Sequence, residues 1–152
     1  MDKQTVVELL RRDVTPELYE QIRNEWKTHS MAEDRRDVAG LLSTLTPDCV
    51  YEIVGTEHVW RGHEGAARFY AGLLGAVPDI KFDLTDIVIG PQGVCEEAAV
   101  TGTPRGTWLG LRPDGQPLSF RVVIFFPWDA ARGKFRGEKV HLDLERLRSH
   151  AD

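Results

Sequence analysis

Hydrophobic positions recur with the period of a helix in the first half of the chain and with the period of a strand in the second half. A helix is predicted to begin after Thr15, because a hydroxyl cap is followed there by a proline and an acid. An apolar stripe from Leu18 through Trp26 extends this helix to about His29 or Met31. This first helix therefore carries Trp26 and His29 on one face.

Two more helices follow from the same kind of pattern. One is predicted from Asp34 or Asp37 to Leu45, where Pro47 ends it. Another begins at Gly62 and carries an apolar stripe as far as Leu74.

The period then changes to that of strands, with turn sequences at 90–93, 113–115 and 131–133. Short turns favour antiparallel pairing of consecutive strands, so most of the sheet is predicted to be a meander. Three helices on one curved sheet give a two-layer α+β fold, in a single domain over residues 1–152. The predicted strands are 49–54, 59–61, 80–89, 94–103, 118–126 and 135–144.

The run Val122–Phe126 is apolar at every position, which indicates a strand with both faces buried. Helices cover only one face of such a sheet. We therefore predict a homodimer that packs sheet against sheet.

The amino-acid composition argues against nucleic acids and membranes as binding partners. Apolar residues make up 41% of the chain, charged residues 28%, and the net charge is −5. An acidic globular chain gains nothing from contacts with phosphates, so nucleic acid is not an expected partner. The first residues lead into a charged helix and no run approaches about 20 apolar residues, so we expect no membrane contact and a cytoplasmic location. Cys49 and Cys95 lie in strand-like runs and are expected to be buried free thiols.

Three passages resemble the SnoaL-like polyketide cyclase (ester cyclase) branch of the NTF2-like, or cystatin-like, superfamily. Gly55–Tyr70 is similar to the branch's strand, glycine turn and helix, and Glu96–Gly115 is similar to its GTHxGxfxGxxPTG pattern. Gly137–Asp143 looks like its terminal strand. Pro104 replaces the histidine of the second pattern, and the branch's QLG tail is absent after Asp143.

This resemblance implies a cone of three helices on a curved mixed or antiparallel sheet of about six strands, enclosing an apolar pocket. It also implies an aspartate, here Asp143, that removes a proton from an activated carbon. Glu52 is a second candidate base, since its strand resembles the one that holds the proton-shuttling aspartate of ketosteroid isomerases. Steroid isomerisation itself is disfavoured, because Trp26 and Val123 stand at the positions of that family's oxygen acids.

Other polar side chains are candidates for supporting roles. His29 and His141 are candidate catalytic partners, and His141 shares one side of its strand with Asp143. Arg121 interrupts an apolar strand, and it is expected either to pair with Glu97 or to bind an anionic group. The candidate substrate-binding residues are Trp26, Tyr51, His58, Trp60, Tyr70, Arg121 and Phe125.

No histidine pair has ligand spacing and no glycine-rich loop follows a strand, so neither a metal nor a cofactor is expected. Two functional hypotheses stay open. The first is a cofactor-independent enzyme, an aldol cyclase, isomerase or related lyase or hydrolase, that acts on a hydrophobic carbonyl compound. The second is a non-catalytic module that binds an apolar small molecule or dimerises.

Overall fold

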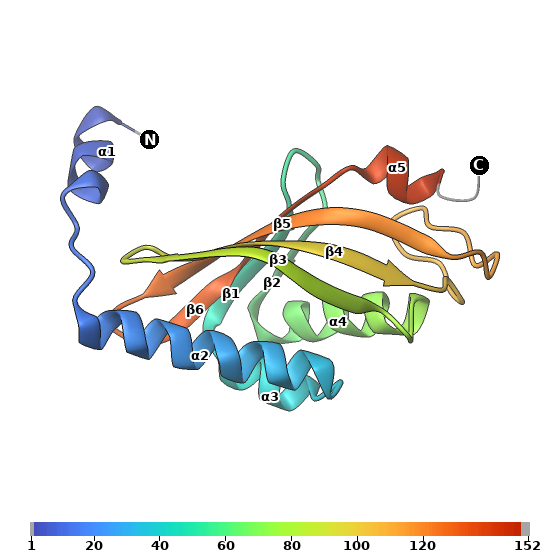
Figure 1. Cartoon of the computed structure of the whole chain (residues 1–152), viewed down its shortest axis with the longest axis horizontal. Helices are drawn as coiled ribbons and strands as arrows, with labels where there is room; N and C mark the ends of the chain where they lie inside the picture. Colours follow the sequence, from blue (N-terminus) through green and yellow to red (C-terminus); the bar gives the residue numbers. More distant parts are fainter. Residues whose placement is uncertain (1, 150–152) are drawn as a thin grey trace.

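A computed structural model describes residues 2–149 of the chain as five helices and six strands (Figure 1). In chain order these elements are α1 (Lys3–Leu10), α2 (Pro16–Asp34), α3 (Val38–Ser43), β1 (Leu45–Ile53), β2 (Val59–Arg61), α4 (Gly62–Ala76), β3 (Lys81–Gly90), β4 (Gly93–Gly102), β5 (Leu118–Asp129), β6 (Lys134–Leu142) and α5 (Leu144–Arg148).

The helix ends follow their capping residues. Thr15 Oγ1 accepts a hydrogen bond from the backbone N–H of Leu18, at 3.1 Å, and fixes the start of α2. Asp37 caps α3 in the same way, through the N–H of Gly40. The helix α2 continues to Asp34, beyond the predicted end at Met31, and this places His29 inside the helix.

The strands form one sheet in the order β2-β1-β6-β5-β4-β3. Consecutive strands from β3 to β6 pair antiparallel, as predicted. The chain then returns through β6 alongside β1, and these two strands are parallel, which makes the sheet mixed. At their junction Gly137 has φ +113°, and a Cβ there would lie 1.9 Å from the carbonyl oxygen of Val50, so only glycine fits without strain.

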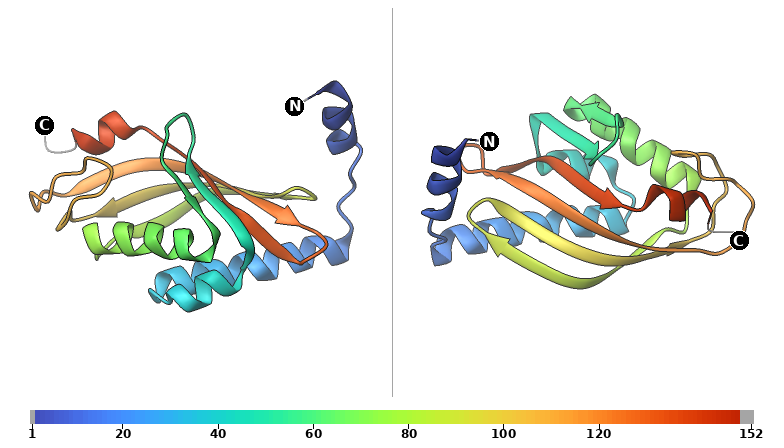
Figure 2. Two further views of the ribbon diagram at one scale, coloured as in Figure 1. Left: turned by 180° about the vertical axis from the view of Figure 1, so that it is seen from behind. Right: turned by 90° about the horizontal axis from the view of Figure 1, so that it is seen from above.

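Helices α2, α3 and α4 cover one face of the curved sheet (Figure 1). Seen from the other side, the outer face is crossed only near its ends, by α1 and α5 (Figure 2). The main core lies between the three helices and the inner face, and includes Ile22, Leu41, Tyr51, Tyr70 and Phe135. This architecture confirms the predicted NTF2-like α+β cone.

The outer face differs in part from the expectations. Val122, Ile124 and Phe126 are buried on the inner face, whereas Val123 and Phe125 on the outer face are half-buried. Homodimerisation through this face stays a prediction.

Cys49 is buried, but Cys95 is exposed, so the expectation of two buried thiols is wrong for Cys95. The reason is strand alternation: Cys95 follows the buried Val94 and so points to the outer face of β4.

Among residues 2–149, no helix combines the length and the apolar character that crossing a membrane requires.

Candidate functional site

The interior of the cone contains three carboxylic acids that come from three different elements. Glu33 follows Trp26 and His29 on the stripe of α2 that faces the sheet, since it lies four residues after His29. Glu96 alternates with the buried Val94 and Ala98 along β4. Glu138 lies two residues before the buried Val140 on β6. A narrow region of the cone therefore holds three acids beside a histidine.

A hydrogen-bond network surrounds His29 and Glu138, both of which are almost fully buried. His29 Nδ1 lies 2.7 Å from Thr44 Oγ1, and His29 Nε2 lies 3.0 Å from Glu138 Oε1. The Tyr70 hydroxyl lies 3.0 Å from His29 Nε2 and donates to Glu138 Oε1 at 2.7 Å. The Tyr51 hydroxyl lies 2.8 Å from that of Tyr70 and extends the network.

Counting donors assigns the protons of this network. The Thr44 hydroxyl donates its only hydrogen to the carbonyl of Leu41, at 2.7 Å, so its oxygen accepts from His29 Nδ1. Tyr70 donates its hydrogen to Glu138 and accepts the hydrogen of Tyr51. Glu138 Oε1 therefore has contacts with both Tyr70 and His29 Nε2, and these hold the carboxyl group in place.

The tyrosines of this network stay protonated. Burial, and next the nearby negative charge of Glu138, raise the pKa of both Tyr51 and Tyr70 well above the ordinary value.

Glu33 and Glu96 differ from Glu138 in how their carboxyl groups are held. Among the described residues, no side chain or backbone group forms a hydrogen bond with the Glu33 carboxyl, and burial together with the charges of Glu138 and Glu96 raises its pKa well above the usual range. Glu96 accepts one hydrogen bond, from Trp26 Nε1 to Oε2 at 2.8 Å. Burial and the charge of Glu138 raise the pKa of Glu96 to about 7, although the bond from Trp26 opposes this change. Both carboxyl groups are therefore harder to ionise than an ordinary glutamate, and Glu96 can exchange a proton near neutral pH.

These three acids line two small cavities. The first, here the acidic hollow, has a volume of about 60 Å³, and the second, the apolar hollow, about 20 Å³. Both volumes are on the scale of one or a few water molecules. Glu33 and Phe82 line both. The acidic hollow is also lined by Trp26, His29, Ser30, Asp34, Leu84, Glu96, Ala98 and Phe126, and the apolar hollow by Phe69, Leu73, Ile80, Trp108, Phe120, Val122, Ile124, Glu138, Val140 and Leu142.

The two carboxylates predicted as bases lie outside these hollows. Asp143 is exposed and caps α5, accepting a hydrogen bond from the N–H of Arg146 at 3.0 Å. His141 shares its side of the chain, as predicted, but that side is exposed as well. Glu52 points to the outer face, between the inward Tyr51 and Ile53, and lies 4.0 Å from Lys139 Nζ. Glu52 alternates to the outer face of β1, and Asp143 follows the end of β6 as the cap of α5, so the expectation that they lie in an apolar pocket is wrong.

Several predicted binding residues do lie inside. Trp26 lines the acidic hollow, whereas Tyr51 and Tyr70 are buried in the network around Glu138. Trp60 packs its ring edge-to-face on Phe69, which lines the apolar hollow, and His58 stacks on Trp60.

The last two of these residues lie on the outer face. Arg121 forms the expected ion pair with Glu97, in an exposed setting, so its pairing is confirmed and its burial is not. Phe125 lines an outer cleft instead of the interior.

Sequence reasoning missed Glu33, Glu96 and Glu138. A signal existed for each, since Glu33 continues the helical stripe of Trp26 and His29, and each strand acid alternates with buried residues. Among residues 2–149, no three His, Cys, Asp or Glu side chains are grouped to hold a metal ion. The arrangement is suited to moving protons within an apolar enclosure.

Comparisons with known proteins agree with this architecture. A search of curated proteins found no match. Among solved structures, a protein assigned to the SnoaL-like polyketide cyclases, from Jannaschia sp. CCS1, superposes with a TM-score of 0.75 at 20% identity, over 91% of this chain and 98% of that one. An epoxide hydrolase of the LEH-like kind, from M. tuberculosis, gives 0.65 at 18% identity, over 85% and 87% of the two chains. TerC, co-crystallised with polyporic acid, gives 0.66 at 16% identity, over 84% and 98%.

At these identities the superpositions show a shared fold. The family model described as SnoaL-like polyketide cyclase matches residues 17–149, which is most of the chain and confirms the resemblance seen in the sequence. The chain therefore belongs to the SnoaL-like polyketide cyclase family.

Proposed function

We propose that this protein is an enzyme that performs cofactor-independent acid–base chemistry on a hydrophobic carbonyl compound, with Glu96 as the base and Glu33 as the acid. The observation that carries the proposal is that both carboxyl groups line one hollow, where burial raises the pKa of each.

The step begins with the carboxylate of Glu96, whose Oε1 carries no hydrogen bond from any described residue. It takes a proton from the carbon next to the substrate carbonyl, the C–H electrons form a C=C bond, and the carbonyl π electrons move to oxygen. Protonated Glu33 then delivers its proton to that oxygen and gives an enol. Return of a proton to another carbon yields an isomer, and attack of the enol on a second carbonyl yields an aldol ring closure.

The residues around Glu96 and Glu33 support their roles as base and acid. Glu138 is fixed by Tyr70 and His29, and its charge raises the pKa of both Glu33 and Glu96. Trp26 holds Oε2 of Glu96 and so orients the base. His29, predicted as a catalytic partner, acts in this proposal by positioning Glu138. Asp143 and Glu52 have no part in it, because they lie outside the hollows.

The walls favour an apolar ring compound. Phe82, Phe120 and Trp108 line the apolar hollow, whose polar side chains are Glu33 and Glu138. A substrate with one or two oxygens on an otherwise apolar skeleton matches this lining. The co-crystal of TerC with polyporic acid is an example, in the same fold, of a complex with a small molecule.

A second candidate function is a non-catalytic module that binds an apolar small molecule or dimerises, and the small size of the hollows bears on both functions. At about 20 and 60 Å³ they admit a ring compound only when side chains such as Trp108 move. The cytoplasmic location and the homodimer also stay predictions, to be tested by cell fractionation and by analytical ultracentrifugation.

The test uses 2-tetralone, a bicyclic ketone, as a probe in D₂O at pH 7. Exchange of its α-hydrogens for deuterium is followed by proton NMR, and its binding by tryptophan fluorescence. The wild type is expected to accelerate exchange over buffer, and Glu96→Gln and Glu33→Gln to lower the rate at least a hundredfold while they still bind the ketone. Glu52→Gln is the matched control on the outer face.

Binding without accelerated exchange would establish the binding module instead. An equal loss of exchange in Glu52→Gln would show that the base is not in the interior.

A further inference from the structure

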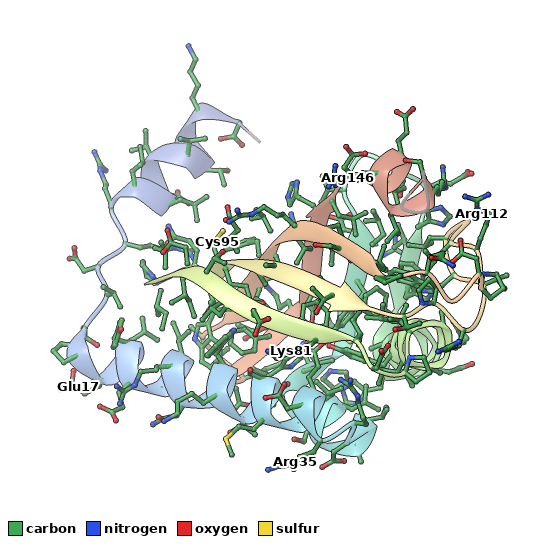
Figure 3. The ribbon with its side chains drawn as sticks, turned by 45° about the vertical axis from the view of Figure 1, so that its right-hand side comes forward. Glu17, Arg35, Lys81, Cys95, Arg112 and Arg146 are labelled. Carbon is green, nitrogen blue, oxygen red and sulfur yellow. The ribbon has the colours of Figure 1, made fainter. Side chains whose placement is uncertain are left out.

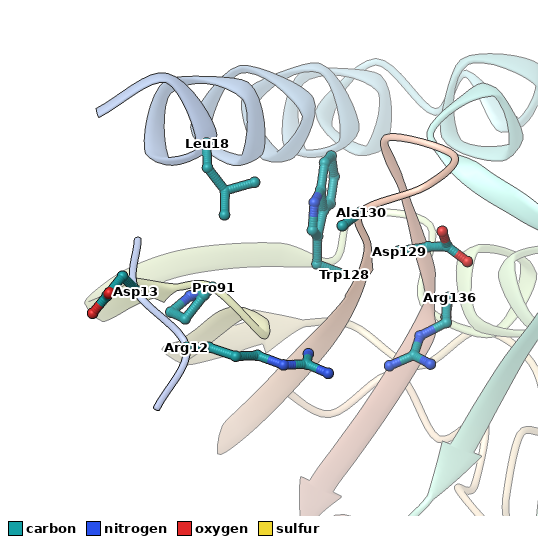
Figure 4. A pocket seen from close by; sticks show the side chains of 8 residues that line it. All are labelled: Arg12, Asp13, Leu18, Pro91, Trp128, Asp129, Ala130 and Arg136. Atoms are coloured by element: carbon teal, nitrogen blue, oxygen red, sulfur yellow. The ribbon is translucent and has the colours of Figure 1, made fainter. Parts of the chain in front are cut away.

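Two arginines from distant parts of the chain face each other on the outer side of the sheet. Arg12 lies in the linker between α1 and α2, and Arg136 lies on β6, and their guanidinium groups point toward one another (Figure 4). Neither guanidinium group forms a hydrogen bond or an ion pair with another residue in the range 2–149. Both side chains are exposed, and two positive charges directed at the same space form a favourable place for an anion.

The acids close to this pair do not supply that anion. The Asp129 carboxylate accepts a hydrogen bond from the backbone N–H of Arg132, at 2.9 Å. It also lies 4.0 Å from the Arg132 guanidinium group. Asp13 points away from both guanidinium groups (Figure 4).

The space between the arginines is a cleft of about 460 Å³, far larger than the interior hollows. Leu18, Pro91 and Trp128 form its apolar wall. The two arginines also line a neighbouring cleft of about 690 Å³ that contains Leu9 of α1. Gln92 Nε2 donates to the carbonyl of Leu9, at 2.8 Å, and so ties the end of α1 to the turn between β3 and β4. This bond holds the linker, and Arg12 with it, at the edge of the cleft.

Trp128 provides a second, independent observation. Its side chain is 4% exposed, and its indole Nε1–H has no hydrogen-bond partner. Buried donors without an acceptor are rare in folded proteins, because burial removes the bond to water that they otherwise form. The indole lies beside Leu18 at the cleft (Figure 4), so its N–H group senses what occupies this space.

We propose that this cleft binds a small organic anion, with a carboxylate or phosphate group between Arg12 and Arg136 and an apolar body against Leu18 and Trp128. Guanidinium groups suit this ligand because they bind the oxygens of carboxylates and phosphates in pairs. This cleft shares no lining residue with the two interior hollows, and the proposal does not depend on the function proposed for the interior.

The test titrates ¹⁵N-labelled protein with phenyl phosphate and with benzoate, each of which joins an anionic group to an aromatic ring. The indole N–H resonance of Trp128, assigned with Trp128→Phe, is expected to shift in a saturable manner with at least one of these compounds. Arg12→Gln and Arg136→Gln are each expected to weaken binding tenfold or more. Phenol and inorganic phosphate separate the contributions of the ring and of the charge.

The matched control is Arg112→Gln, which removes the same charge from a position far from α1 (Figure 3). It is expected to leave the dissociation constant within about twofold. The proposal is overturned if the indole resonance does not move at millimolar ligand, or if Arg112→Gln weakens binding as much as Arg136→Gln. It is also overturned if ultracentrifugation finds a dimer that Arg136→Gln dissociates and that phenyl phosphate leaves intact, because a second copy then occupies the cleft.

Discussion

Replacing Glu96 by glutamine tests whether ionisation of this buried carboxyl group lowers the stability of the folded protein. The carboxyl of Glu96 has a pKa of about 7 in the folded protein, against 4.5 for an unperturbed glutamate. Between these two pH values the folded state binds more protons than the unfolded state, so raising the pH lowers the free energy of unfolding. Since each tenfold change in proton affinity is worth about 1.4 kcal/mol, the full effect is about 3 kcal/mol.

Glutamine is neutral at every pH and still accepts the hydrogen bond from Trp26. We therefore expect the free energies of unfolding of Glu96→Gln and the wild type to change with pH in nearly the same way below about pH 4.5. Above about pH 7 the free energy of unfolding of the variant should have risen by up to about 3 kcal/mol relative to that of the wild type.

Urea denaturation at half-unit steps between pH 4.5 and 8 measures this difference. Glu52→Gln, on the outer face, is the matched control for the change from glutamate to glutamine. A gap between wild type and Glu96→Gln that does not change with pH would refute the assignment of a raised pKa to this residue.

Three further predictions concern the frame around the site. Tyr70→Phe keeps the ring but removes the hydroxyl that joins Tyr51 to Glu138, and it should cost about 1–3 kcal/mol in urea denaturation; a loss below about 0.5 kcal/mol would mean that the network is not closed. Gly137→Ala places a Cβ against the carbonyl of Val50 and should lower the melting temperature by 10 °C or more by circular dichroism, whereas an unchanged melting temperature would contradict the tight β1–β6 junction. With Ellman's reagent the exposed Cys95 should react in the native protein and Cys49 only after unfolding, because Cys49 is buried and burial raises its pKa to about 11; two equally fast thiols would contradict this.

Local patterns along the chain were sufficient to predict most of the elements. The three apolar stripes correspond to α2, α3 and α4, and the turns at 90–93 and 131–133 separate strands that do pair antiparallel. The parallel pairing of β1 with β6 was not predicted in detail, because it joins residues more than 80 positions apart and no local turn encodes it.

The candidate site was predicted less well, and the reason is which face of a strand points inward. Glu52 and Val50 do share a face, as predicted, but Tyr51 and Ile53 occupy the inner one. On β6 the same alternation sends Glu138 and Val140 inward and His141 outward. The pKa values of Glu33 and Glu96 depend on contacts between α2, β4 and β6, which only the folded chain brings together.

The most direct test of the interior acid–base pair is a carboxyl titration by carbon NMR, on protein labelled with ¹³C at the glutamate side-chain carboxyl. Glu96→Gln and Glu33→Gln serve to assign the two resonances. The account predicts that Glu96 titrates with a midpoint of about 7 and that the midpoint of Glu33 lies well above 4.5. Midpoints near 4.5 for both residues would contradict it.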